Sequence, residues 1–501
     1  MKKVATVFAV LSLLVSCSFA QTLYSYDQSN PASSDEPQPI HIDLGSGDSS
    51  KAFDLSRSFR QFQHFLDNPF NLSREMDFPQ VDTTKDSLVA EFSTGGLKLR
   101  KRHSMNFLIT DPPVNQITRY LEPFSMIDFN RVNGFFLGIG TGKYVDFGQY
   151  DEFGLKGGIG IGFTEDKGQS VIGGEFRIPL SPLRPTDDGV TRKRFISVPT
   201  IAMGAEYHNV TTTEDHWRTE RLENAVYAFL VREDFRDYFK IEGWNVQLAY
   251  RPFKNDEVQV QYRSDMYYDQ YQRVFYGRWG GNKRLPENPA ITQGKMNSVV
   301  LTYQAERASN DYIDGHTLFD DEVTIEARQG TSYQVELEFG DMSDLNASFQ
   351  RYIIDVRHFQ PVIFGINIDS RLRLEAGVGD APIQKLQYIG GPSSLPAFKN
   401  KEYAGNRMAL LNTEIRINLA SLSTLFQKEN VQLLIKNDFG YINTATDSSS
   451  VFSGFGGDNS PNIIYNIGFG IGHVSGIELG WSWRTDKVEQ ARFFFRFQRP
   501  F

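Results

Sequence analysis

The sequence predicts an all-β protein, a transmembrane antiparallel β-barrel of sixteen strands that follows a short mixed N-terminal region. Three observations predict this fold class. The chain of 501 residues is 13% aromatic, yet its mean hydropathy is a hydrophilic -0.39. From about residue 126 onward, apolar residues alternate with polar residues or glycine. The polar positions include charged residues, which would be costly in the dry core of a soluble sandwich.

The composition excludes several other classes of protein. A polytopic helical membrane protein needs about 20 mostly apolar residues for each span, and this chain is too hydrophilic for that. A disordered chain would not carry 40 Phe, 22 Tyr and 5 Trp. One Cys excludes an intrachain disulfide framework and a Cys-rich zinc site. The formal net charge of -9 argues against a nucleic-acid partner.

Residues 1–20 read as a signal peptide. A basic start is followed by an apolar stretch, Val4 to Val15, and small residues, Ser18 and Ala20, precede Gln21. This pattern predicts export and cleavage after Ala20, and the apolar stretch is too short to span a membrane. The preceding residues also fit a bacterial lipobox, so lipidation of Cys17 stays open as the alternative.

Residues 21–125 are predicted to form a periplasmic N-terminal extension. Residues 28–51 are rich in Ser, Asp, Pro and Gly and read as a linker. Residues 52–68 carry apolar side chains at approximately helical spacing, which predicts one short helix packed on a larger body, with a partner-binding helix as the alternative. The extension is long enough for one small domain at most.

Residues 126–501 are predicted to form the barrel. In residues 364–376, for example, apolar side chains alternate with polar ones that include Arg371, Arg373 and Glu375. Such charges are normal on the wall of a wet lumen. The runs are long enough to cross a bilayer, and their apolar faces are often aromatic, as in membrane barrels. An array of secreted β-sandwiches is the alternative with the same period.

Fifteen candidate strands lie between Val132 and Phe501, and single-chain bacterial barrels normally have an even number. We therefore expect sixteen, with the remaining strand in 209–239, in 268–295 or near Leu88 to Leu97. The span Leu222 to Phe239 reads as a helix within a connection. In the last strand, aromatic residues alternate and the chain ends on Phe. We interpret these residues as the signal that outer-membrane assembly machinery recognises: Phe493, Phe495, Phe497 and Phe501.

A second pattern lies between Leu386 and Leu419. A Gly pair is followed by a short segment that ends in Phe, and then by the sequence LLNTEIRINL. With the motifs of residues 437–441 (NDFGY) and 129–134 (FNRVNG), this stretch resembles the bacterial surface antigen superfamily, which includes the BamA and TamA assembly factors. The resemblance covers about 126–501. It implies that the loop enters the lumen and carries these motif residues: Gly390, Gly391, Leu395, Pro396, Ala397 and Phe398.

The sequence departs from the family pattern at this loop. The family motif is Val-Arg-Gly followed by Phe or Tyr, and its arginine is absent here because Pro396 stands at that position. In the family, that arginine meets acidic groups on the lumen wall. Glu414 is the natural acidic partner, and Arg416 on the same strand face is placed to neutralise it; both are also expected as ordinary wall charges. In addition, we place no POTRA module in 21–125.

The resemblance implies an outer-membrane role in protein or lipid biogenesis or in translocation, with a lumen partly plugged by residues 380–404 and a weak seam between the first and last strands. A passive channel, or a structural or accessory subunit of an envelope complex, is the alternative. The sequence shows no nucleotide loop, metal-ligand pair or nucleophile elbow. We therefore expect no enzyme activity, cofactor or metal, although a hydrolase whose Ser and His meet only in space stays open. Expected partners are outer-membrane lipid, the assembly machinery and other envelope proteins.

Overall fold

The computed structural model describes residues 97–98, 127–147, 151–164, 168–180, 199–253, 255–279, 282–317, 319, 321–423, 430–445, 450–455, 463–474, 476–487 and 491–497. The chain divides into two units, residues 1–58 and 59–501, and every described residue belongs to the second. The predicted signal peptide, Cys17 and Phe501 lie outside the described residues. The predicted extension, residues 21–125, also lies outside them except for residues 97–98.

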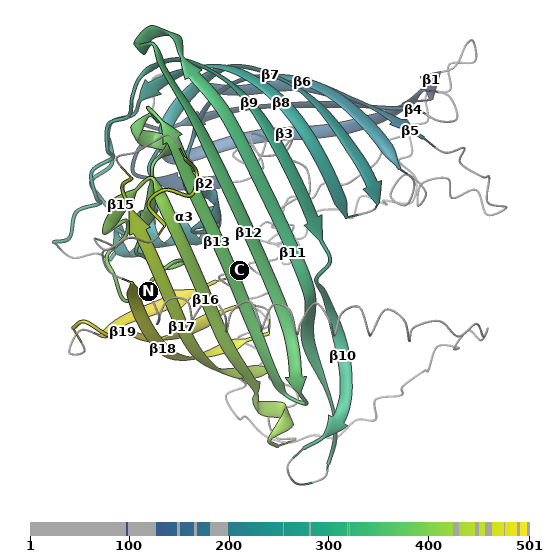
Figure 1. The fold of residues 1–501 in the computed structure, drawn as a ribbon, viewed down its shortest axis with the longest axis vertical. Helices are drawn as coiled ribbons and strands as arrows, with labels where there is room; N and C mark the ends of the chain where they lie inside the picture. The colour runs from purple at the N-terminus through teal and green to yellow at the C-terminus, as the bar shows by residue number, and fades with distance from the viewer. Residues whose placement is uncertain are drawn as a thin grey trace, which may run out of the picture. The chain divides into compact units, whose positions relative to one another are not determined.

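The described residues form one large antiparallel sheet, in which consecutive strands pair with each other (Figure 1). Its first half contains β2 (Ile127–Asn130), β3 (Gly134–Phe147), β4 (Asp151–Gly162), β5 (Gln169–Pro179), β6 (Thr200–Thr212), β7 (Phe239–Phe253), β8 (Asp256–Asp269) and β9 (Gly294–Glu306). Its second half contains β11 (Glu322–Met342), β12 (Ala347–Ile363), β13 (Ile366–Gly379), β16 (Arg407–Asn418), β17 (Val431–Asn443), β18 (Ile464–His473), β19 (Glu478–Arg484) and β20 (Ala491–Arg496).

Two further segments complete the sheet. β1 (Leu97–Lys98) pairs with the end of β3, whereas β2 pairs with its beginning, so both lie along one edge of β3. Likewise, β10 (Ser309–His316) and β9 pair with successive parts of β11. The eighteen strand segments therefore occupy sixteen positions, which confirms the predicted number. The position that was missing from the sequence count lies upstream of Val132.

The two faces of the sheet differ as the alternation predicted. One face buries charged side chains such as Asp369, Arg371 and Glu375, each at most 2% exposed. The opposite face exposes large apolar side chains, among them Ile139, Ile159, Trp244, Phe469 and Trp481. An apolar outer face and a polar inner face are what a strand between lipid and a wet lumen requires. The described helices include none that is long and apolar enough to cross a membrane.

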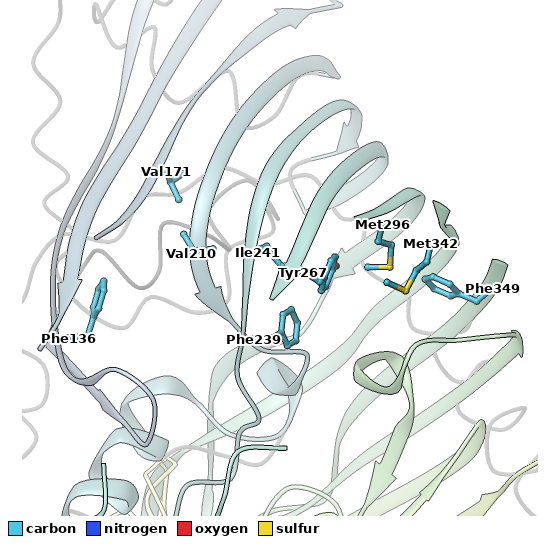
Figure 2. Packing of buried hydrophobic residues seen from close by; sticks show 9 residues of the cluster. All are labelled: Phe136, Val171, Val210, Phe239, Ile241, Tyr267, Met296, Met342 and Phe349. Atoms are coloured by element: carbon cyan, nitrogen blue, oxygen red, sulfur yellow. The ribbon is translucent and has the colours of Figure 1, made fainter. Parts of the chain in front are cut away.

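The inner face becomes apolar near one end of the strands. Nine buried side chains from β3 to β12 line up there, as Figure 2 shows: Phe136, Val171, Val210, Phe239, Ile241, Tyr267, Met296, Met342 and Phe349. The long connections 213–238, 270–293 and 380–406 all start and finish at this end, which we call the loop end. Ile291 and Ala381 from two of these connections pack against the cluster. The loop end is therefore where connections cover the inner wall.

The connection between β6 and β7 carries the 3-10 turn η5 (Asp215–Trp217) and the helix α3 (Arg221–Val231), which lies beside β2 (Figure 1). The predicted helix, Leu222 to Phe239, was therefore right in its first part only. The helix ends because Arg232 adopts a left-handed conformation with φ of 56°. The side chain of Asn224 then fixes the returning chain, since its Oδ1 accepts the N–H of Phe235 at 2.8 Å.

Candidate functional site

The first part of the site is the connection between β13 and β16, residues 380–406, which we call the lumen loop. It contains η7 (Ile383–Lys385) and a short hairpin of β14 (Gln387–Ile389) and β15 (Tyr403–Gly405). The predicted Gly390-Gly391 pair makes the turn after β14, with φ of 113° and 99°. A Cβ on Gly390 would lie 2.2 Å from the carbonyl oxygen of Lys399, so the close approach requires glycine.

The lumen loop docks on the inner wall through apolar contacts. Leu395, Ala397 and Phe398 are at most 3% exposed. With Ile389, they form one cluster with residues from β16, β17 and β18: Met408, Leu410, Ile442 and Ile464. Met408 and Leu410 share the inner face of β16 with Glu414 and Arg416. Residues 395–398, where the motif of the resembled superfamily has an arginine, therefore hold the loop by hydrophobic packing.

Gly440 on β17 makes room for this docking. A Cβ there would lie 2.8 Å from Cδ1 of Leu395 and 3.3 Å from Cδ1 of Ile389. We expect Gly440→Val to displace the lumen loop, because a branched side chain needs the space that Leu395 fills. Limited proteolysis after Lys399 should then become faster. Gly377→Ala on β13 is the matched control, since its Cβ would meet nothing closer than 3.6 Å. Equal cleavage of both variants would contradict this packing.

Below the lumen loop, the inner wall carries a closed network of charges. Arg416 pairs with Asp369 at 2.8 Å, with Glu414 at 2.5 Å, and also with Glu478. Lys436 pairs with Glu414 at 2.6 Å and with Glu478 at 2.5 Å. All five side chains are at most 4% exposed and come from β13, β16, β17 and β19. The structure thus places both predicted wall residues in one network, in which strand cations neutralise Glu414.

A second set of charges joins the lumen loop to the β6–β7 connection. Lys401 pairs with Asp215 at 2.6 Å and also with Asp237, which in turn pairs with Arg131 beside β2. Arg218 donates to the carbonyl oxygens of Tyr388 and Gly390, the latter at 3.1 Å. The lumen loop is therefore held by apolar contacts with the wall and by ion pairs and hydrogen bonds with the connection that carries α3.

Asp215 makes the contact between the lumen loop and the β6–β7 connection sensitive to acid. Burial raises the pKa of Asp215, but Lys401 and Arg218 outweigh it, so its pKa lies below the ordinary value. A carboxyl with a lowered pKa stabilises the fold above its ordinary pKa of about 3.9, and this stability is lost as the pH falls through the lowered value. We expect the fluorescence of neighbouring Trp217 to change as the pH falls below the ordinary pKa of Asp215. The Trp217 signal is obtained by subtracting the fluorescence of the Trp217→Phe variant. Asp215→Asn should abolish the transition; a transition that persists would contradict the assignment.

The second part of the site is the seam between the first and last strands. Among the described residues, no residue-by-residue backbone pairing joins β20 to β1, β2 or β3. The helix α3 lies there instead. The hydroxyl of Tyr227 donates to the carbonyl oxygen of Phe495 and accepts the N–H of the same residue at 3.2 Å. Burial raises the pKa of Tyr227, so the hydroxyl keeps the proton that this contact needs.

Charges reinforce the contact between α3 and β20. Arg496 donates to both carboxylate oxygens of Glu223, at 2.5 and 3.2 Å, and both side chains are buried. Arg496 also donates to the carbonyl oxygen of Pro392 at 3.0 Å, and Arg492 to that of Phe398 at 2.6 Å. The last strand is thus held by α3 and by the lumen loop. We call the contacts of Glu223 and Tyr227 with β20 the seam clasp.

The other side of α3 packs against the first strands. The ring of Phe229 lies 5.2 Å from that of Phe129 on β2 and 5.4 Å from that of Phe135 on β3, measured between centroids. Ala225 and Ala228 are buried in the same cluster. One helix therefore contacts the edges of both the first and the last strand, and between the described parts of these strands side-chain contacts stand where a backbone ladder would run.

Sequence reasoning missed the seam clasp. It identified a helix in this connection and the aromatic residues of the last strand, and Phe493 and Phe495 lie on β20 with Phe497 directly after it. Their role as an assembly signal stays a prediction. A usable signal was Glu223 within a helix that is otherwise rich in apolar residues, together with Arg496 between aromatic residues of the last strand. Each is a charge in an apolar setting, which calls for a buried partner.

The site consists of contacts that hold chain segments together. Within the residues that the structure describes, no group of three or more His, Cys, Asp or Glu side chains is placed to hold a metal ion. The expectation that the protein is not an enzyme stays a prediction. The geometry that is present consists of a docked loop, a charged wall and a seam closed by side chains.

Comparisons with known proteins give likenesses of fold. No family model matches the sequence. No curated protein matches it either. Among solved structures, BamA from Haemophilus ducreyi lacking POTRA domains 1-3 is similar, with a TM-score of 0.40 and 13% identity over 74% of this chain and 67% of that one. CdiB from Acinetobacter baumannii gives 0.32 and 10%, and CdiB from Escherichia coli 0.33 and 12%.

The matches cover 74% of this chain, but only 57% and 61% of the two CdiB chains. All three TM-scores lie below 0.5, so the fold class is assigned from the strands of this chain alone. Those strands occupy sixteen antiparallel positions with an apolar outer and a polar inner face. The chain therefore has the strand number and the two faces of a transmembrane antiparallel β-barrel, the fold class that the sequence predicted.

Proposed function

We propose that this chain is exported through a cleaved signal peptide to the bacterial outer membrane, where it acts in protein or lipid biogenesis or in translocation. The observation that carries the proposal is the seam. Elsewhere in the sheet, neighbouring strands share backbone ladders, such as the twelve residue pairs between β3 and β4. A seam held by one helix is easier to open than a ladder, because fewer hydrogen bonds must break. Such a seam offers a lateral path between lumen and lipid.

The test is depletion of the protein followed by quantification of outer-membrane proteins and lipids. We expect at least one of them to fall, and to recover when the unaltered chain is supplied. A chain with Glu223→Cys and Arg496→Cys, joined across the seam by a short bismaleimide, should not restore it. The same double variant without the reagent separates the effect of the tether from that of the lost ion pair. An unchanged composition after depletion would overturn the proposed role.

A second role, as a passive channel or as a structural or accessory subunit of an envelope complex, is favoured by a different observation. The lumen loop is docked by an apolar cluster, and the charges on the wall below it pair with one another. Conductance in planar bilayers, with and without residues 380–404, tests the channel version. Purification from outer membranes with identification of what co-purifies tests the subunit version. A stable partner, with no change in outer-membrane composition on depletion, would favour this second role.

A further inference from the structure

The connection between β8 and β9 exposes an unusual group of side chains at the loop end. Residues 271–279 and 282–284 contain four aromatic residues, and each is at least half exposed: Tyr271 68%, Phe275 59%, Tyr276 51% and Trp279 69%. The same twelve residues carry four cations, Arg273, Arg278, Lys283 and Arg284, and no anion. We call this group the rim patch. It stands out in a chain whose net charge is -9.

Two of these cations form no ion pair with a described residue. Arg278 and Arg284 are exposed, and neither forms an ion pair with any residue that the structure describes. Lys283 pairs with exposed Glu233, and Arg273 donates to the carbonyl oxygen of Thr164 at 2.9 Å. The rim patch therefore presents two exposed guanidinium groups among exposed aromatic rings.

The rim patch is held in place by the rest of the fold. Its backbone N–H groups at Val274 and Trp279 donate to carbonyl oxygens of Arg131 and Leu230, at 3.1 and 2.9 Å. Arg232, at the end of α3, donates to the carbonyl oxygens of Gly277 and Lys283 at 3.0 and 2.7 Å. Val274 and Leu285 are buried in the cluster beneath α3. Exposure of the aromatic rings is thus a property of an anchored segment.

The rim patch continues a band of aromatic residues on the outer face of the sheet. Exposed aromatic side chains from β6, β7 and β8 precede it toward the loop end: Tyr207, Trp244, Tyr262 and Tyr268. The rings of Trp244 and Tyr262 lie 5.3 Å apart between centroids. Aromatic side chains gather where a membrane protein leaves the hydrocarbon and enters the headgroup region. The band therefore brings the rim patch to headgroup level.

We propose that the rim patch binds the anionic headgroups of the lipid leaflet at the loop end, next to the seam. Guanidinium groups bind phosphate oxygens through paired N–H donors, and aromatic rings lie at the boundary between headgroup and hydrocarbon. The contact fixes the depth of α3 and the seam in the membrane. It requires only that the barrel lies in a membrane, so it stands or falls independently of the proposed role in biogenesis.

The test uses quenching of Trp279 by brominated lipid. The full chain is reconstituted in phosphatidylcholine bilayers that contain either brominated phosphatidylglycerol or brominated phosphatidylcholine at equal fractions. The signal of Trp279 is the difference between the unaltered chain and Trp279→Phe. We expect stronger quenching by the anionic lipid. Arg278→Gln with Arg284→Gln should weaken the preference for anionic lipid by about fivefold for each cation removed.

Lys295→Gln with Lys399→Gln is the matched control, because both lysines are exposed at the loop end and lie outside the rim patch. This control should keep the preference for anionic lipid, and salt should weaken it in the unaltered chain. Three outcomes would overturn the proposal. They are equal quenching by the two lipids, a preference that survives loss of both arginines, and no quenching of Trp279 by either lipid. The last would place the rim patch clear of the membrane and favour a soluble anionic partner.

Discussion

Replacing Arg416 with glutamine is expected to lower the free energy of unfolding by about 3–5 kcal/mol, because removal of one partner leaves buried charges uncompensated. Arg416 faces Asp369, Glu414 and Glu478, and without it Lys436 would still pair with Glu414 and Glu478. Bringing carboxylates together without a cation is costly in a site of low dielectric constant. Urea unfolding of the purified barrel in detergent measures the change.

Arg357→Gln is the matched control for this prediction. Arg357 is also a strand arginine, but it is 29% exposed and its partner Asp355 keeps Arg371 and Arg373. We expect its loss to cost less than about 1 kcal/mol. An Arg416→Lys variant should recover part of the stability, since a cation returns without the paired donors. Similar losses for Arg416→Gln and Arg357→Gln would show that the charge network does not stabilise the wall.

The second large effect is expected at the seam clasp. Tyr227→Phe combined with Glu223→Gln removes the hydroxyl that satisfies the backbone of Phe495 and the carboxylate that neutralises Arg496. Breaking a buried pair costs about 3–5 kcal/mol, so the equilibrium between closed and open seam should shift by at least about a hundredfold. Hydrogen exchange at the amide of Phe495 should become faster by a similar factor, whereas the amides between β11 and β12 should keep their protection.

Tyr352→Phe combined with Glu233→Gln is the matched control for the clasp. It removes the same two kinds of group where they are partly exposed: the Tyr352 hydroxyl donates to Gln350, and Glu233 pairs with Lys283. Exchange at Phe495 should stay unchanged in this variant. If the clasp variant also leaves exchange at Phe495 unchanged, then α3 does not hold the last strand.

The strands could be predicted from the sequence because alternation records the two environments of each strand. Arg371, Arg373 and Glu375 could be assigned to the lumen wall, since a charge on the lipid face would be costly. The first strand position could not be found, because β1 and β2 are segments of two and four residues that share one edge. Segments that short carry no periodic signal.

The connections were harder to predict, since their structure depends on distant partners. The turn at Gly390-Gly391 followed from its residues, but the apolar docking of Leu395 and Phe398 depends on strands that follow later in the chain. The seam clasp joins Glu223 to Arg496 across 273 residues. Local patterns contain no information on such a pairing, and buried ion pairs of this kind are found only when the fold brings the two segments together.

The central claim is that α3 closes the seam between the first and last strands in place of a backbone ladder. The most direct measurement is photo-crosslinking from position 227 in intact outer membranes, with p-benzoylphenylalanine in place of Tyr227 and the adducts mapped by mass spectrometry. The account predicts an intramolecular adduct within residues 491–497, weakened when Glu223→Gln is added. Adducts confined to other parts of the chain, together with a direct cross-link between cysteines placed on β2 and β20, would contradict it.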